Sequence, residues 1–180
     1  HQALTYLSMV SAVPNVEVVC LTCADEAQSL ISQCIEKFAS DRKAGKTPRS
    51  TVFFLGRETY PSSFSPGATY QLGKAQIVSD NTSEFGDSVT LVAAGSILEN
   101  ALMAQKQLAE NGKGSIVVNP STINSPDIET LKTCLSKTGG RLVTVEDHRE
   151  VAGCGAMLCH SLLTNGISCQ VKTLGIKDHF

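Results

Sequence analysis

Apolar residues recur along the chain with two alternating spacings. Mostly apolar runs such as 16–21 and 89–93 have the length and composition of buried β-strands. Elsewhere, as in 27–38 and 97–108, apolar residues return every three or four positions, which is typical of one face of an α-helix. Strands that alternate with helices predict an α/β fold with a mostly parallel sheet. We expect strands at 16–21, 50–56, 89–93, 115–118, 141–145 and 168–174, and helices near 3–10, 22–38, 96–110, 126–139 and 153–163.

This periodicity breaks down once, between residues 57 and 73. The stretch is rich in Pro, Ser and Gly and repeats no apolar spacing, as is usual for a domain boundary. The residues before it give only helix, strand, helix and strand, which looks like the second half of an α/β domain. We therefore predict two units, residues 1–70 and residues 71–180.

Charge and composition narrow the class of partner. The chain has 15 Lys and Arg against 17 Asp and Glu, a net charge of -2, which argues against a partner held through nucleic-acid phosphates. No apolar run approaches the roughly 20 residues that cross a bilayer, so we expect no membrane partner. Because the chain begins with His1 and not Met, we expect it to be an internal stretch of a longer polypeptide.

The seven cysteines are odd in number, irregularly spaced and mostly embedded in apolar stretches. A disulfide framework is usually denser and even, so we interpret them as free, buried thiols in a reducing compartment, the cytoplasm. Cys20 and Cys23 have the spacing of a redox pair or half a zinc site. No second pair follows at ligand spacing, which favours a structural role for both.

Arg57 is the most informative candidate for binding. It follows Gly56 at the carboxyl end of a predicted strand, where open α/β sheets bind their ligands. A guanidinium there can bind a phosphate through two parallel hydrogen bonds. An ion pair with Glu58 or another surface acid explains the residue equally well, so both interpretations stay open on the residues alone.

Two other patterns have a plainer explanation. Gly153 and Gly155 open a predicted helix after a strand, as in a dinucleotide-binding loop, but the third glycine is absent and Glu146 and Asp147 would repel a pyrophosphate. Close packing of the helix on the sheet is the favoured interpretation. The basic stretch 42–49 lacks interleaved aromatic residues and is expected to be a solvated loop.

Several blocks, in order along almost the whole chain, together resemble the transketolases. Their order and spacing are specific to transketolase-like thiamine enzymes, although no block is decisive by itself. The blocks are HQAL at 1–4, VPN at 13–15, FFLGRETYP at 53–61, LGKA at 72–75, VTLVAAG at 89–95, TVEDH at 144–148 followed by GCG at 153–155, and KDHF at 177–180.

The resemblance implies a fold and two site residues. Residues 1–70 correspond to the C-terminal half of a pyrimidine-binding domain, and residues 71–180 to the transketolase C-terminal domain, a three-layer α/β/α unit, without its last segment. His1 corresponds to the catalytic histidine that hydrogen-bonds the donor sugar. Arg57 corresponds to the arginine that binds the substrate phosphate. The implied activity is transfer of a two-carbon ketol unit from a ketose phosphate to an aldose phosphate, in the pentose phosphate pathway.

The resemblance also implies partners that lie outside this chain. Transketolases use thiamine diphosphate with Mg²⁺ or Ca²⁺, and the motifs that bind these groups would precede His1. We therefore expect no cofactor or metal ligands within residues 1–180, and no activity from this stretch alone. The expected assembly is a cytoplasmic homodimer, or a complex with an N-terminal transketolase subunit if the enzyme is split, acting on sugar phosphates.

Other members of the same architecture remain as alternatives. A 1-deoxyxylulose-5-phosphate synthase tends to have a second histidine after the first and a YPRG block, whereas this chain has Gln2 and the sequence GRE at 56–58. A 2-oxoacid dehydrogenase beta-type subunit fits the first block less well. Two further alternatives are a non-catalytic, transketolase-like dimerisation module and a small nucleotide-binding domain built on Gly153 and Gly155.

Overall fold

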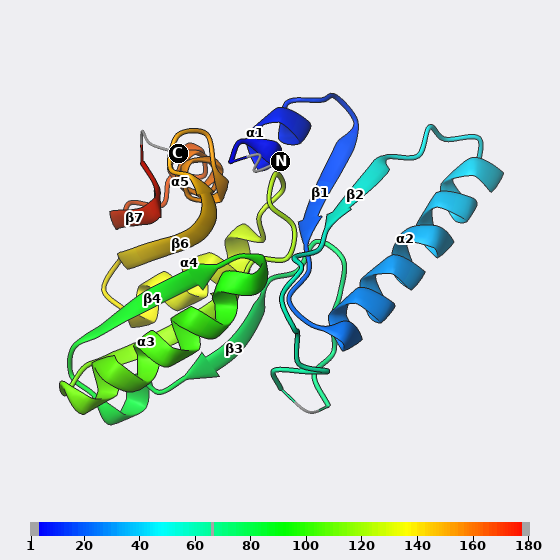
Figure 1. The fold of residues 1–180 in the computed structure, drawn as a ribbon. Coiled ribbons are helices and arrows are strands. Elements are labelled where there is room, and N and C mark those ends of the chain that lie inside the picture. Colours follow the sequence, from blue (N-terminus) through cyan, green and yellow to red (C-terminus); the bar gives the residue numbers. More distant parts are fainter. Residues whose placement is uncertain (1–3, 66, 178–180) are drawn as a thin grey trace.

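The computed structural model describes residues 4–65 and 67–177, and it contains two β-sheets (Figure 1). The larger sheet has the strand order β3-β5-β4-β6-β7, and all its neighbouring strands are parallel except β3, which runs antiparallel to β5. The predicted α/β class with a mostly parallel sheet is confirmed. Its strands are β3 (Gln76–Asp80), β4 (Ser88–Ala93), β5 (Gly114–Asn119), β6 (Arg141–Arg149) and β7 (Gln170–Ile176).

Helices cover both faces of this sheet, which explains its continuous apolar strands. Along β4, Leu91 packs with α3 (Leu98–Glu110) on one face. The next residue, Val92, packs on the other face with α4 (Ile128–Lys137) and α5 (Cys154–Thr164). Successive side chains of a strand point to opposite faces, so every central position of β4 is buried against one of the two helical layers.

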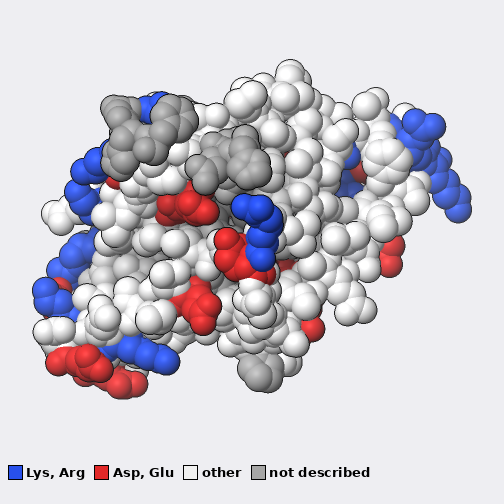
Figure 2. Space-filling view, in the orientation of Figure 1, with Lys and Arg blue, Asp and Glu red and all other residues white. Residues whose placement is uncertain are grey.

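The smaller sheet consists of β1 (Val16–Cys20) and β2 (Ser50–Phe54), paired in parallel. The short helix α1 (Tyr6–Ser11) precedes it, and the long helix α2 (Ala24–Lys43) connects the two strands. The predicted basic loop 42–49 begins too early, because Arg42 and Lys43 form the last turn of α2, where cations interact favourably with the helix dipole. Figure 2 shows basic side chains at this far end of α2.

The irregular stretch after β2 is present as predicted. Residues 55–75 contain no helix or strand in the part that the structure describes, which excludes residue 66. One edge of β1 is closed by a loop that follows β5: the amide of Cys20 donates to the carbonyl of Ser121 (2.9 Å), and the amide of Ile123 donates to that of Val18 (2.8 Å). These backbone bonds join the first part of the chain to the larger sheet.

A buried carboxylate lies at the same junction. Glu26 of α2 is fully buried and accepts hydrogen bonds from the Thr22 amide (2.7 Å) and hydroxyl (2.6 Å). From the other side, the Asn119 side-chain amide (2.9 Å) and the Ser121 hydroxyl donate to the second oxygen. Buried carboxylates need such partners, so this network fixes α2 against the end of β5.

The end of β6 differs from the prediction. The apolar pattern predicts a strand that stops at Val145, but the strand continues to Arg149, which pairs with Ile176 of β7. The Arg149 amide also donates to the carbonyl of Leu4 (3.0 Å), so the start of the described chain lies beside this extension. No helix in the described ranges is both long and apolar enough to span a bilayer.

Candidate functional site

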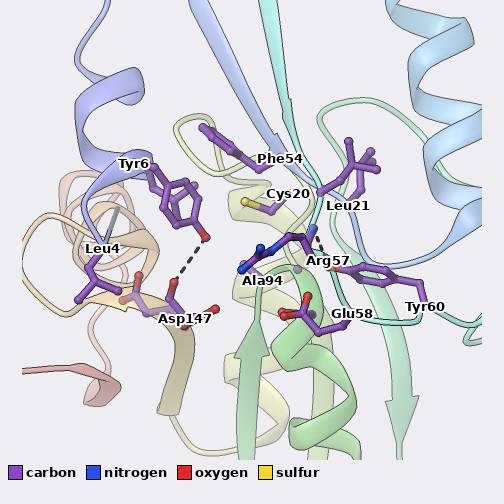
Figure 3. Close-up of a pocket in the computed structure, with 16 residues that line it drawn as sticks. Leu4, Tyr6, Cys20, Leu21, Phe54, Arg57, Glu58, Tyr60, Ala94 and Asp147 are labelled. Atoms are coloured by element: carbon purple, nitrogen blue, oxygen red, sulfur yellow. Dashed lines mark hydrogen bonds between the residues drawn. The ribbon is translucent and has the colours of Figure 1, made fainter. Parts of the chain in front are cut away.

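A pocket of about 500 Å³ opens where the two sheets meet (Figure 3). Its walls come from α1, from the carboxyl ends of β1 and β2, and from the segments at the ends of β4 and β6. Ligands of open α/β sheets bind at such carboxyl ends. The pocket therefore lies where the strand pattern places a ligand, and both parts of the chain contribute to it.

Arg57 lies in this pocket, three residues after the end of β2. Figure 3 shows its side chain extending toward the wall that carries Tyr6 and Asp147. It is exposed and forms no salt bridge within 4.0 Å with Glu58 or any other acid among the described residues. The guanidinium is thus available to a ligand, and an ion pair with Glu58 does not explain it.

The turn that carries Arg57 begins at Gly56, which lies close to two side chains. The Gly56 amide donates to the hydroxyl of Tyr60 (2.9 Å), so the end of the tyrosine side chain lies close to the backbone of the turn. A Cβ atom at position 56 would lie 2.1 Å from the Tyr60 hydroxyl and 2.1 Å from a carboxylate oxygen of Glu58. A side chain at position 56 would therefore require the ends of the Tyr60 and Glu58 side chains to move.

The opposite wall carries a packed, neutral phenol. The Tyr6 ring packs against Phe54, with ring centroids 4.7 Å apart, and edge-on against His148 at 5.3 Å. Its hydroxyl donates to the carbonyl oxygen of Asp147 (3.4 Å). Burial raises the pKa of Tyr6 above its ordinary value, so the phenol stays protonated at neutral pH.

Cys20 lines the pocket, but its thiol is not poised for nucleophilic attack. The residue is buried, and desolvation raises the pKa of the thiol to about 12. The thiolate is the reactive form of cysteine, so a thiol with this pKa is inert at neutral pH. Cys23 instead contacts the hydroxyl of Tyr70 (3.1 Å), and both cysteines are free, in agreement with a structural role.

The paired glycines of α5 serve close packing, which confirms the favoured interpretation. A Cβ atom on Gly153 would lie 2.1 Å from a carboxylate oxygen of Glu146, and one on Gly155 would lie 2.4 Å from the Thr144 hydroxyl. The Glu146 carboxylate accepts hydrogen bonds from the amides of Cys154 (2.6 Å) and Gly155 (3.1 Å). The amides that could have held a phosphate at this helix start are therefore taken by a carboxylate.

This arrangement at α5 does not fit the pyrophosphate of thiamine diphosphate. Residues 4–65 and 67–177 contain no group of three or more His, Cys, Asp or Glu side chains that could hold a metal ion. The pocket itself is lined by one guanidinium, two tyrosine hydroxyls and several carboxyl groups.

Glu146 makes stability depend on pH. Desolvation raises the pKa of its carboxyl from 4.5 to about 7, although the two amides favour the charged form. The folded chain then holds this proton more tightly than the unfolded chain. The resulting stabilisation is complete below about pH 4.5 and is lost as the pH rises through 7.

We therefore expect the stability advantage of the wild type over Glu146→Gln to fall by roughly 3 kcal/mol between pH 4.5 and 8. Urea unfolding of both proteins across this range measures it. Glu84→Gln, which changes an exposed glutamate, should leave the pH profile unchanged. Parallel pH profiles for Glu146→Gln and the wild type would contradict the assignment.

The two residues named from the resemblance have different outcomes. Arg57 lies in the pocket, whereas His1 lies outside the described residues. Neither Tyr6 nor Tyr60 was predicted as a site residue from the sequence. Tyr60 belongs to the same block as Arg57, which was the available signal, but Tyr6 reaches the pocket only through contacts with residues more than 40 positions away.

Comparison with known proteins gives a family for the chain. The sequence profile described as "Transketolase, C-terminal domain" matches residues 73–179, more than half of the chain. The chain is 28% identical over 180 residues to a "Putative transketolase C-terminal section" of Methanocaldococcus jannaschii, covering all of this chain and 52% of that protein. It is 27% identical over 180 residues to a 1-deoxy-D-xylulose-5-phosphate synthase of Clostridium perfringens, covering 100% of this chain and 27% of the relative.

A human relative and a solved structure agree with this result. "Transketolase-like protein 2" of Homo sapiens is 31% identical over 128 residues, which are 65% of this chain and 20% of that protein. The solved structure, described as "Split gene transketolase, inactive beta4 tetramer", superposes with a TM-score of 0.80 at 27% identity, over 100% of this chain and 54% of that one. The chain spans about half or less of the length of these relatives. The chain belongs to the transketolase family and carries its C-terminal domain.

Proposed function

We propose that this chain is the C-terminal portion of a transketolase that transfers a two-carbon ketol unit from a ketose phosphate to an aldose phosphate in the pentose phosphate pathway. One observation carries the proposal: the guanidinium of Arg57, which has no salt-bridge partner among the described residues, lies in a pocket at the carboxyl end of β2. Arg57 also belongs to the block that resembles the phosphate-binding block of transketolases.

In this proposal Arg57 binds the phosphate of the sugar and His1 hydrogen-bonds the reacting end of the donor. A phosphate far from the reacting carbon contributes binding energy that orients the carbonyl. The neutral hydroxyls and the carboxylates of the pocket suit the hydroxyl groups of a sugar. Thiamine diphosphate, which the family uses, supplies the carbanion chemistry when bound, and its ligands lie mostly outside this chain.

The proposal requires a partner for this chain. We propose that residues 1–70 complete a pyrimidine-binding domain together with an N-terminal transketolase part, either as preceding sequence or as a separate subunit, in a cytoplasmic homodimer. Some relatives have names that support such a division: a transketolase "C-terminal section", one subunit of an apulose-4-phosphate transketolase, and a split-gene transketolase.

A second function is favoured by one observation, the match over the full chain to 1-deoxy-D-xylulose-5-phosphate synthases. An assay of the assembled enzyme with thiamine diphosphate and Mg²⁺ distinguishes the two. We expect turnover of xylulose 5-phosphate with ribose 5-phosphate, and none of pyruvate with glyceraldehyde 3-phosphate. The reverse result would identify a synthase. Turnover of neither pair, in an assembly that retains thiamine diphosphate, would identify a non-catalytic module.

A further inference from the structure

The segment that presents Arg57 is exposed between two fixed points. Residues 55–59 are all exposed and belong to no helix or strand. Before them, β2 ends at Phe54. After them, the carbonyls of Pro61 and Ser62 accept hydrogen bonds from the amides of Ala24 (3.3 Å) and Asp25 (3.0 Å) at the start of α2. These backbone anchors fix the two ends of the segment, but they do not fix the direction of the Arg57 side chain between them.

Tyr60 supplies a further constraint inside this segment. Its side chain is half-buried and folds back across the turn, so that its hydroxyl accepts a hydrogen bond from the Gly56 amide (2.9 Å), next to Arg57 (Figure 3). Tyr60 and Ser96, which lies in the segment after β4, also line the same pocket.

We infer that Tyr60 is a positioning residue for substrate phosphate: its hydrogen bond to the Gly56 amide fixes the Gly56–Arg57 turn and thereby aims the guanidinium into the pocket. This inference rests on the proposed role of Arg57. Tyr60 acts through Arg57 and not on the reacting atoms.

The contacts of Tyr60 distinguish it from the neighbouring Glu58. A Glu58 carboxylate oxygen also lies close to the Cα of Gly56, where it would meet a Cβ at 2.1 Å, but Glu58 is exposed and forms no salt bridge with Arg57 within 4.0 Å. Tyr60 combines a hydrogen bond to the turn with partial burial. A phenylalanine at position 60 keeps the ring and removes only the hydroxyl.

The test measures kcat/KM of the assembled enzyme for a ketose phosphate and for the same ketose without its phosphate. We expect Tyr60→Phe to lower kcat/KM for the phosphorylated donor about three- to tenfold, mainly through KM, as for the loss of one hydrogen bond. The value for the unphosphorylated donor should not change. Tyr70→Phe is the matched control, because it removes a buried hydroxyl that contacts Cys23 outside the pocket, and it should leave the ratio of the two values unchanged.

A double-mutant cycle separates this inference from the proposed function. If Tyr60 acts through Arg57, adding Tyr60→Phe to Arg57→Ala should cause no further loss. A full additional loss in the double variant, or equal losses for both donors, would show that Tyr60 has a merely structural role. If Arg57→Ala alone weakens phosphate recognition while Tyr60→Phe does not, this inference fails and the proposed function stands. If Arg57→Ala has no effect, the proposed function itself fails.

Discussion

Arg57→Ala should lower kcat/KM of the assembled enzyme for a ketose phosphate by about one to two orders of magnitude, mainly by raising KM. A hydrogen bond to a charged group contributes about 1.5–3 kcal/mol, and about 1.4 kcal/mol corresponds to a factor of ten. The guanidinium has no salt-bridge partner among the described residues, so no carboxylate among them loses an ion-pair partner when Arg57 is replaced. The expected effect is therefore confined to substrate binding.

The matched control is Arg42→Ala, which removes an exposed arginine at the end of α2, outside the pocket. It should leave kcat/KM within about twofold of the wild type, as for a surface substitution. Arg57→Lys keeps the charge but loses the planar pair of donors, so its effect should be intermediate. An unchanged kcat/KM for a sugar phosphate in Arg57→Ala would exclude the phosphate-binding role.

The second large effect concerns stability. Glu26→Ala should lower the free energy of unfolding by about 3–5 kcal/mol, because it leaves buried donors of Thr22, Asn119 and Ser121 without their acceptor. Each buried polar group that loses its partner costs about 1–3 kcal/mol, and a cavity adds to this. Glu26→Gln keeps the shape of the side chain and one oxygen acceptor, so its loss should be smaller.

Urea unfolding of the two variants measures these losses. Glu36→Ala provides the control, since Glu36 lies on the same helix but is exposed, and its substitution should change the free energy of unfolding by less than about 0.5 kcal/mol. Equal effects of Glu26→Ala and Glu36→Ala would show that the network at the junction does not hold α2 in place.

This network also bears on the pocket. Glu26 fixes the start of α2 against the end of β5, and the carbonyls of Pro61 and Ser62 are bound to the same start of α2. The turn that carries Arg57 lies just before these two residues. A loss at Glu26 should therefore disturb the Arg57 turn as well as the fold, whereas a loss at Tyr60 should disturb the turn alone.

Much of the fold followed from local spacing. The apolar runs predicted β1, β4 and β5, and the helical spacing predicted α3 and α5. A strand that is buried on both faces, and a helix that is buried along one stripe, each have a characteristic spacing of apolar residues. The direction of β3 was not predictable, since a strand has the same period of two whether its neighbour is parallel or antiparallel. The extension of β6 to Arg149 depends on pairing with β7 and on contact with Leu4, neither of which is local.

The candidate site likewise has features that follow from the sequence and features that only tertiary contacts create. The sequence by itself determined that Arg57 stands at the carboxyl end of a strand, and that Gly153 and Gly155 suit close packing better than a phosphate. Only the tertiary structure decided three other features. Arg57 has no salt-bridge partner among the described residues, the Tyr60 hydroxyl is bonded to its turn, and Glu26 is buried. These features arise from contacts across folded turns and between elements far apart in the chain, such as α2 and the end of β5, which no spacing along the chain records.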